Sequence, residues 1–196
     1  MQNSSQLRQV LRTARRALSP SLQRLHARRL ARHLGKHPFF LRARRLALYW
    51  PADGEIDPRP VLDRPHARAK HVYLPVLNPL GRSKSLWFAR YRPDGPLRFN
   101  RFGIPEPHQC GRQLIPIRHL DLIILPLVGF DAHGNRLGMG GGFYDRTLAY
   151  RRRYTHWQRP RLVGVAHECQ RVEHIEAKPW DIRLDMILTE AGCYLP

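Results

Sequence analysis

The chain places four glycines within five positions, from Gly138 to Gly142, shortly after an apolar stretch. Leu122 to Leu125 are apolar without alternation, which is typical of a strand covered on both faces. The glycines leave the backbone free to adopt positive φ angles and to bring its amides close to an anion. Phe143, Tyr144 and Asp145 open an expected helix, whose N-terminal amides add to the same positive field. The pattern predicts a buried strand that leads into a phosphate-binding loop.

Two charged residues flank the glycines, Arg136 before them and Asp145 after them. An arginine can bind phosphate oxygens, and a carboxylate can hold a metal ion that bridges them. The two common phosphate motifs do not fit, because no Gly-Lys-Ser/Thr ending occurs and Phe143 stands where the dinucleotide fingerprint needs glycine. A glycine-rich turn without any ligand is the alternative interpretation.

Around this motif the chain carries the runs GFDAHGNRLGMGGGFYDR, WPADGEID, NRFGIPEP and VAHECQRVEHIEAKPWDIRLD. Together they resemble the 5-formyltetrahydrofolate cyclo-ligase family (methenyltetrahydrofolate synthetase), over nearly the whole chain. The resemblance implies ATP-dependent closure of 5-formyltetrahydrofolate to 5,10-methenyltetrahydrofolate, with release of ADP and phosphate. The formyl oxygen attacks the γ-phosphoryl group, N10 adds to the activated carbon, and phosphate leaves. No protein nucleophile is required, in agreement with a sequence that offers no Ser-His-Asp or Cys-His signature.

The same resemblance implies a set of ligand-binding positions. For ATP they are Arg8, Arg136, Leu137, Gly138, Met139, Gly140, Gly141, Gly142, Phe143 and Tyr144. For the folate, which can carry a polyglutamate tail, they are Trp50, Glu55, Met139, Gly140, Gly141, Gly142 and Phe143. The implied Mg2+ ligands are Asp145 and Asp181, and the catalytic candidates are Arg136 and Tyr144. Chemistry of this type depends on positioning and on charge neutralisation at the transferred phosphoryl group.

Two positions depart from the family pattern, which has a Lys and, four residues on, an Arg in the first helix. The Arg falls on Arg8, but Ser4 occupies the Lys position and cannot supply a cationic contact. Phe143 replaces the first of two tyrosines and lacks its hydroxyl. Glu55 can accept hydrogen bonds from the NH groups of a pterin edge, and Trp50 offers a flat apolar face. The alternative interpretations are a surface acid for Glu55 and a core aromatic for Trp50. For Arg8 the alternative is a solvated helix charge, and for Tyr144 it is packing of the helix on the sheet.

Apolar spacing predicts an amphipathic helix over Leu7 to Leu18, with arginines 8, 12, 15 and 16 between its apolar residues. Ser19 and Pro20 are a typical cap and first residue for a second helix, with Gly35 as its stop.

Further along the chain, strands are expected at 45–50, 71–77, 86–91, 161–166 and 186–189, and helices from Asp57 and from 144 to about 150. Residues 92–117 are rich in proline and glycine and predict a long irregular loop, in which Glu106 is better interpreted as a loop carboxylate than as a ligand. The 196 residues therefore predict a single α/β domain over 1–196: a central, mostly parallel sheet flanked by helices, with two helices at the N-terminus.

The formal charge of +19 is unevenly distributed. Residues 1–52 hold 12 Lys and Arg and no acid, whereas the remainder holds 22 against 15. Such a surface can attract ATP, a polyanionic substrate or nucleic acid through non-specific charge. A basic RNA-binding protein is the main rival hypothesis, although no RNA-recognition consensus is visible. A family member that has lost catalysis is the second rival, for which Ser4 is the hint.

Three dispersed cysteines, Cys110, Cys169 and Cys193, predict reduced, buried thiols in a cytoplasmic protein. No apolar run approaches the roughly 18 residues of a membrane helix, so no membrane partner is expected. The arginine-rich start superficially matches a mitochondrial presequence, but the resemblance extends into it and favours a folded helix. A monomer is expected. His167 and His174 lie seven apart without a third ligand at helical spacing, so no zinc site is predicted.

Overall fold

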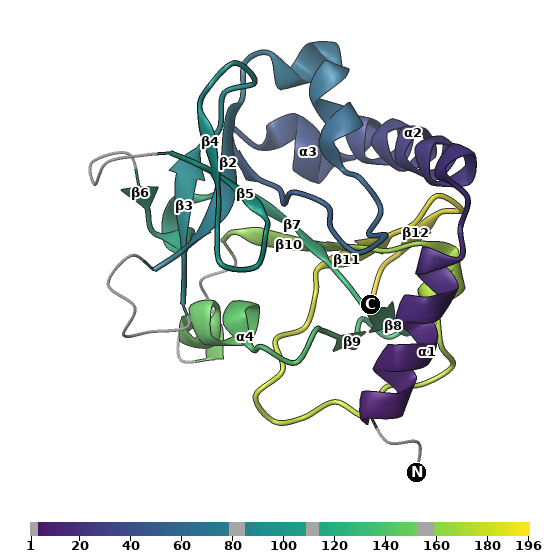
Figure 1. Ribbon diagram of the computed structural model, residues 1–196. Helices are drawn as coiled ribbons and strands as arrows, with labels where there is room; N and C mark the ends of the chain where they lie inside the picture. The colour runs from purple at the N-terminus through teal and green to yellow at the C-terminus, as the bar shows by residue number, and fades with distance from the viewer. Residues whose placement is uncertain (1–3, 79–84, 109–113, 153–158) are drawn as a thin grey trace.

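The core of the structure is an eight-stranded sheet with the strand order β12-β11-β10-β7-β1-β2-β3-β6 (Figure 1). The computed structural model describes residues 4–78, 85–108, 114–152 and 159–196. The strands of this sheet are β1 Arg45–Ala47, β2 His71–Leu77, β3 Leu86–Arg90, β6 Leu114–Ile115, β7 Leu122–Pro126, β10 Arg161–Val165, β11 Met186–Leu188 and β12 Cys193–Tyr194. Two antiparallel ribbons accompany it, β4 Leu97–Phe99 with β5 Pro105–Pro107 and β8 Gly129–Phe130 with β9 Arg136–Leu137.

Five neighbouring strands, from β11 to β2 in the sheet order, run parallel, whereas β12 and β3 pair antiparallel with their neighbours. The central strand β7 pairs with β1 on one side and β10 on the other, and Leu122 to Leu125 are at most 1% exposed. The predicted mostly parallel sheet and its doubly covered strand are thus confirmed. Because parallel strands end at the same edge, that edge collects the loops that follow them.

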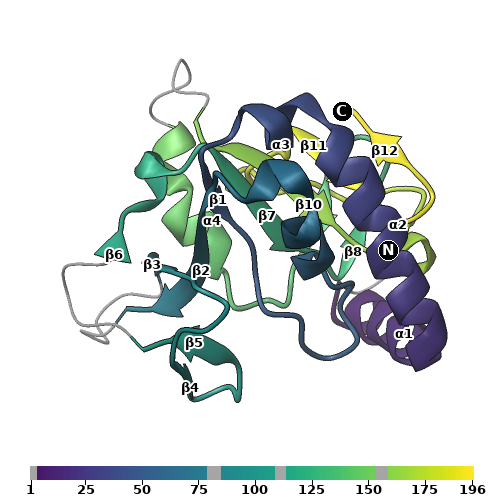
Figure 2. The same cartoon turned by 90° about the horizontal axis from the view of Figure 1, so that it is seen from above.

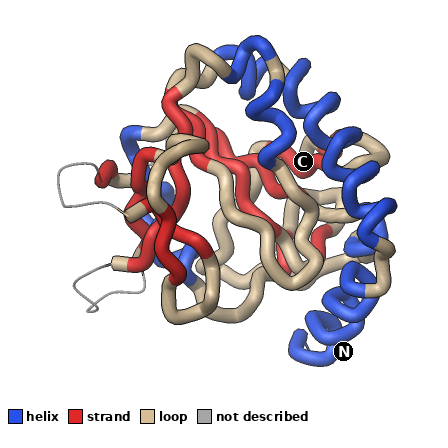
Figure 3. The backbone as a smooth tube through the Cα atoms, turned by 45° about the horizontal axis from the view of Figure 1, so that its top comes forward, coloured by secondary structure: helices blue, strands red, loops and turns tan. Residues whose placement is uncertain are grey.

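Helical segments cover both faces of this sheet. They are α1 Ser4–Arg16, α2 Pro20–Lys36, α3 Pro38–Arg42, α4 Phe143–Thr147 and the 3-10 helices η1 Arg59–Asp63, η2 Pro65–Ala67, η4 Ile117–His119, η5 Ala149–Arg152 and η6 Glu168–Gln170. Figure 2 shows α2 and α3 over the sheet seen from above, and Figure 3 shows the strands as one twisted band with α1 and α2 along its side.

Alternation along β7 divides the core into two layers. Leu122 and Ile124 belong to a buried cluster with Leu30 and Leu34 of α2, whereas Ile123 belongs to a second cluster on the opposite face, next to α4 and η5. Since successive side chains of a strand point to opposite faces, one apolar run serves both layers. The sequence of β7 therefore requires helices on both sides.

The first helix, predicted over Leu7 to Leu18, runs instead from Ser4 to Arg16, whereas α2 begins as predicted but ends differently. The Ser19 hydroxyl caps α2 by accepting a hydrogen bond from the backbone N–H of Leu22 at 3.3 Å. Gly35 was expected to stop this helix, but α2 continues to Lys36. His37 is its C-cap residue and directly precedes Pro38. The proline opens α3 and cannot donate a helical hydrogen bond, so it ends α2 more sharply than the glycine does.

Several expected boundaries are wrong because turns and proline replace regular structure. The strand predicted for 45–50 ends at residue 47, the expected helix after Asp57 is the short pair η1 and η2, and the helix predicted for 144–150 is split into α4 and η5. The described parts of the region 92–117 are not wholly irregular, since they form the β4–β5 hairpin, strand β6 and the start of η4. A further strand, β12, follows the one expected to be last.

Two cysteine expectations are also corrected. Cys169 and Cys193 are exposed free thiols rather than buried residues, because they lie on η6 and on the edge strand β12. Cys110 lies outside the described residues. Among the helices of the described ranges, none has the length and apolar character that a membrane span requires.

The packing of α2 on the sheet makes a direct prediction for stability. Leu30 is fully buried in the cluster that joins α2 to β7, whereas Leu25 on the same helix is 43% exposed. Leu30→Ala should lower the free energy of unfolding by about 2–5 kcal/mol through a cavity, and Leu25→Ala by less than about 1 kcal/mol. Urea unfolding followed by circular dichroism measures both, and equal losses would contradict this packing.

Candidate functional site

The glycine segment 138–142 lies on the surface between β9 and α4 (Figure 1). Gly140 and Gly142 have φ angles of 89° and 63°, in the left-handed region that favours glycine. A Cβ atom added at Gly138 would meet nothing within 4 Å, so this backbone is open to a ligand. The helix that follows, α4, has only five residues, and its amides therefore add less to an anion site than the sequence suggested.

The buried strand does not lead straight into the glycines, because the β8–β9 hairpin intervenes. Its turn is held by the buried carboxylate of Asp131, which accepts hydrogen bonds from the backbone N–H groups of His133, Asn135 and Ile175 at 2.9–3.0 Å. Burial by itself would raise the pKa of Asp131, but the hydrogen bonds from the Asn135 side chain and from these amides hold it below its usual value. This charged turn fixes where β9 delivers Arg136 and the glycines.

Helix α1 reaches the glycine segment through Arg8. Its Nε donates a hydrogen bond to the carbonyl of Gly138 at 2.8 Å, and its Nη1 donates to the carbonyl of Ser4 at 3.3 Å. A Cβ atom at Gly140 would lie 3.9 Å from the guanidinium carbon of Arg8. The structure thus places this arginine beside the segment, and Ser4 begins the same helix one turn earlier.

Arg136 lies in β9, just before the segment, and its side chain is almost fully enclosed. Its guanidinium donates hydrogen bonds to the carboxylate of Asp145 and to the carbonyl of Ile182. Burial lowers the pKa of Arg136, while the nearby carboxylates of Asp145 and Asp181 oppose that shift. An arginine keeps its proton under such conditions, so the site holds a fixed cation between two acids.

Asp181 itself accepts a hydrogen bond from the backbone N–H of Lys178 at 2.9 Å. A cavity of about 240 Å³ adjoins Asp181 and Arg136, and Asn135 and Lys178 also line it. The two acids expected to act together therefore face one guanidinium, although 36 residues separate them in the sequence. Carboxylate oxygens are the donor type that Mg2+ prefers, so the chemistry of these two side chains suits the predicted ion.

Tyr144 and Glu55 lie close enough to influence each other. Burial raises the pKa of Tyr144 above its usual value, Glu55 adds to the rise, and Arg136 opposes it. Burial likewise raises the pKa of Glu55, and Arg15 opposes it. The loop after β1 and the helix after the glycines therefore meet, and Glu55 is not the free surface acid of the alternative interpretation.

The loop 50–57 is bound to α1 through Asp53. Its carboxylate accepts hydrogen bonds from Arg12 and Arg15 at 2.8 and 2.9 Å, and it also pairs with Arg16. Asp53 adopts a left-handed φ of 54°, and a Cβ atom on the next residue, Gly54, would lie 3.3 Å from the carbonyl of Arg15. The loop thus packs directly on the helix backbone.

Arg15 carries this connection into the interior, where it is fully buried. Besides Asp53, it lies 3.7 Å from the carboxylate of Glu55 and donates a hydrogen bond to the carbonyl of Leu127 at 3.4 Å. The helical spacing groups this arginine with the other charged residues of the helix, so its burial was not predicted. It follows Leu11 by four residues on the apolar face, which was the sequence signal for its burial.

The remaining predicted positions occupy different surroundings. Phe143 packs edge-on against Phe102 of the NRFGIPEP run, with ring centroids 6.2 Å apart, which brings that run to the glycine segment. Met139 is 53% exposed, whereas the side chain of Leu137 is buried in a cluster with Leu11. Only the backbone of Leu137 is therefore available to a ligand.

Trp50 packs on Tyr91, with centroids 6.3 Å apart, and the guanidinium of Arg59 covers its ring at 4.2 Å. Glu106 is buried and accepts hydrogen bonds from Leu77 N–H and the Asn100 side chain, consistent with a structural role. A cavity of about 930 Å³ between β2, β3 and the β4–β5 hairpin is lined by Tyr91 but by no residue of the glycine segment.

With this geometry established, comparison with known proteins identifies the class. The sequence profile of the 5-formyltetrahydrofolate cyclo-ligase family matches residues 1–190. The 5-formyltetrahydrofolate cyclo-ligase of Escherichia coli K12 is 40% identical over 182 residues, which cover 92% of this chain and 96% of that protein. The Haemophilus influenzae enzyme of the same name is 40% identical over 191 residues, covering 94% and 98%.

Solved structures agree with this comparison. The NMR structure of 5,10-methenyltetrahydrofolate synthetase from Aquifex aeolicus superposes with a TM-score of 0.79 at 30% identity, covering 98% of this chain and 92% of that one. The Mycoplasma pneumoniae synthetase, at 21% identity and a TM-score of 0.71, shares the fold over 96% of this chain and 99% of that one. The chain belongs to the 5-formyltetrahydrofolate cyclo-ligase family, and is thus an enzyme of the ligase class.

The arginine contacts of Asp53 make its charge a measurable contributor to stability. Asp53→Asn keeps a residue that tolerates the left-handed φ but removes the charge, so it should lower the free energy of unfolding by about 1–3 kcal/mol at neutral pH. The pKa of Asp53 is lower in the folded state than in the unfolded state, because the effect of burial is outweighed by the arginine hydrogen bonds. The difference in stability between wild type and variant is therefore largest above about pH 3.9, the pKa in the unfolded state, and disappears as the pH falls through the pKa in the folded state.

Urea unfolding at several pH values measures the difference between wild type and Asp53→Asn. Asp63→Asn, an exposed residue of η1, is the matched control and should change stability little at any pH. A loss for Asp53→Asn that stayed constant down to pH 2 would contradict the ionic account.

Proposed function

We propose that this enzyme catalyses the ATP- and Mg2+-dependent cyclisation of 5-formyltetrahydrofolate to 5,10-methenyltetrahydrofolate, releasing ADP and phosphate. The observation that carries the proposal is the open glycine segment with two arginines near it, Arg8 on α1, which binds the Gly138 carbonyl, and Arg136 in β9, which binds Asp145 just after the glycines. Beside it lie the half-buried Tyr144 and Glu55, which suit the polar edge of a ring system. Membership of the cyclo-ligase family supplies the substrate class.

The proposed chemistry uses ATP as a co-substrate and needs no protein nucleophile. The formyl oxygen attacks the γ-phosphorus, and the bond from that phosphorus to the bridging oxygen of ADP breaks. The N10 nitrogen then adds to the activated formyl carbon and loses its proton. Inorganic phosphate leaves with the former formyl oxygen, which creates the methenyl bridge. Each step gains from alignment of the reacting atoms and from neutralisation of charge on the phosphates.

Arg136 is assigned to the transferred phosphoryl group because its cation is enclosed and its position is fixed by Asp145 and Ile182. A cation that is already oriented stabilises developing negative charge without reorganisation at the moment of reaction. The backbone amides from Leu137 to Gly142 and the guanidinium of Arg8 are assigned to the remaining phosphate oxygens. Tyr144 donates its hydroxyl proton in this arrangement, since its raised pKa keeps it neutral.

The carboxylates of Asp145 and Asp181 are assigned to Mg2+, which supplies charge neutralisation between phosphate oxygens when bound. Both acids act electrostatically on the guanidinium of Arg136, which supports assigning them to one metal ion. In the structure Asp145 pairs with Arg136, and ATP would offer that arginine a competing anion. The exchange frees the carboxylate for a metal ion.

The folate is assigned to the opposite side of the glycine segment, against Glu55, Met139 and Phe143, with the Trp50 ring nearby in the same loop as Glu55. Glu55 is oriented by the backbone N–H of Ala52, which donates to its carboxylate at 3.1 Å. A monomer in the cytoplasm, with nucleic acid attracted only through non-specific charge, remains the expectation from the sequence.

Replacement of Arg136 tests the phosphate assignment. Arg136→Ala should lower kcat/KM for methenyl product by roughly a hundredfold or more while the protein still folds. The absorbance of the methenyl product, with Mg-ATP and 5-formyltetrahydrofolate, measures the rate. Arg152→Ala is the control, because Arg152 also donates to a backbone carbonyl of this region, that of Trp180, but lies outside the proposed site. Wild-type turnover in a folded Arg136→Ala protein would remove Arg136 from the mechanism.

Restoring the family lysine tests the N-terminal part of the site. Ser4→Lys should lower the KM for ATP by roughly two- to fivefold, because one partly exposed charge contact contributes up to about 1 kcal/mol. Ser5→Lys adds the same charge at the next position of α1 and should change the KM much less, since it points to a different side of the helix. Equal KM values for both variants and wild type would show that the existing arginines already suffice.

A further inference from the structure

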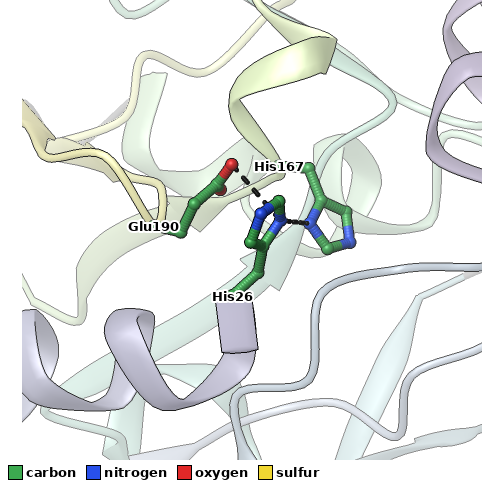
Figure 4. A group of neighbouring side chains, drawn as sticks. All are labelled: His26, His167 and Glu190. Atoms are coloured by element: carbon green, nitrogen blue, oxygen red, sulfur yellow. Dashed lines mark hydrogen bonds and ion pairs between the residues drawn. The ribbon is translucent and has the colours of Figure 1, made fainter. Parts of the chain in front are cut away.

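Two imidazoles and a carboxylate converge beneath α2, outside the residues assigned to the reaction (Figure 4). His26 comes from α2, His167 follows β10, and Glu190 follows β11. The Nδ1 atoms of the two histidines are 2.9 Å apart, and the Nδ1 of His26 is 3.3 Å from a carboxylate oxygen of Glu190. All three potential ligand atoms lie within 4.8 Å of one another.

The three groups are enclosed by protein. His167 has no exposed surface, and His26 and Glu190 are each 9% exposed. Burial, with a smaller contribution from His26, lowers the pKa of His167 to about 4, so its ring is neutral at physiological pH and retains a lone pair. Its Nδ1 is the atom that faces the Nδ1 of His26, while the backbone of Gly54 also interacts with this ring.

Without a metal, one proton on the Nδ1 of His26 is shared between two acceptors, the Nδ1 of His167 and the carboxylate of Glu190 (Figure 4). A metal ion can replace that proton and be bound by all three lone pairs at once. Zinc binds nitrogen at 2.0–2.1 Å, which places tetrahedral ligand atoms roughly 3.3 Å apart. The observed separations of 2.9 and 3.3 Å are close to this value, the third lies within 4.8 Å, and a small rotation of the rings would direct the lone pairs to a common centre.

The ligand groups are held in place by a surrounding set of hydrogen bonds. The backbone N–H of Glu168 donates to both carboxylate oxygens of Glu190 at 3.2 and 3.1 Å. The side-chain oxygen of Gln170 accepts from the backbone N–H of His167 at 2.9 Å. Such outer partners orient metal ligands in known sites and raise their affinity. The carboxylate of Glu168, bonded to Tyr194 and Thr189, places a further negative charge on the same turn.

We propose that His26, His167 and Glu190 form a binding site for a borderline transition-metal ion of the zinc type, which joins α2 to the carboxyl ends of β10 and β11. Two imidazoles and one carboxylate leave a fourth position for water. The nitrogen ligands distinguish this site from the all-oxygen pair of Asp145 and Asp181, which suits Mg2+. The site is independent of the proposed reaction, so either assignment can fail alone.

Metal binding to the full-length protein tests the proposal. After treatment with a chelator, wild type should bind one equivalent of Zn2+ tightly and unfold at a higher temperature in its presence. Co2+ should give the intense visible absorption of a four-coordinate nitrogen and oxygen site. Glu190→Gln and His26→Gln keep the side-chain size similar. Loss of a residue that only orients a metal ligand costs roughly 10- to 100-fold in affinity, so loss of a ligand itself should weaken Zn2+ binding by at least that much.

His33→Gln is the matched control, because His33 is an exposed histidine of the same helix. It should bind Zn2+ as wild type does. Anomalous scattering from a zinc-soaked crystal of the wild type needs no variant, and a peak between the three side chains is the expected result.

Three results would overturn the proposal. One is unchanged Zn2+ affinity in both site variants, which would place the ion on surface histidines. Another is a wild-type protein that gains no thermal stability from Zn2+. The last is a zinc-soaked crystal with no peak at the cluster. After any of these results, the three residues would be a hydrogen-bonded cluster that joins α2 to the sheet without a metal ion.

Discussion

The buried guanidinium of Arg15 is the interaction on which the arrangement of the site depends. It joins α1 to Asp53 and Glu55 in the loop after β1 and to the carbonyl of Leu127 after β7. A buried charge is tolerated only when it is paired and hydrogen-bonded, so removal of any partner leaves an unsatisfied ion. The helix therefore has one permitted position. Since α1 also carries Arg8, the same contact sets the phosphate side and the folate side of the proposed site relative to each other.

The parallel sheet explains why residues distant in sequence meet. Its central strands β1, β7, β10 and β11 all end at one edge, and each is followed there by a polar or charged segment. The loop with Asp53 follows β1, the hairpin with Arg136 follows β7, and His167 and Glu190 follow β10 and β11. Crevices at the carboxyl ends of parallel strands are the usual ligand sites of open α/β sheets. The proposed metal cluster uses the same edge, but beneath α2.

The sequence predicted those features that depend on local pattern. Strand His71–Leu77 was predicted with the observed boundaries, as was the Ser19 cap, because period and capping are local. The β4–β5 hairpin was missed, since its strands have only three residues each and prolines occupy two of the three positions of β5. Arg15 and Asp53 were missed because a buried ion pair leaves no periodic signal beyond one arginine on an apolar face. The His26 cluster joins residues 141 positions apart, which no local spacing can reveal.

The arginines of the two N-terminal helices fall into two groups. On α1, three arginines share the single carboxylate of Asp53, so this corner of the molecule keeps an excess of positive charge even after pairing. On α2, the arginines are exposed, and Arg24, Arg28 and Arg29 have no ion pair with any acid of the described residues. Exposed charges contribute little to stability. The excess on α1 can instead attract anions, and if ATP binds as proposed, it meets Arg8 and Arg136 already held by hydrogen bonds to backbone carbonyls.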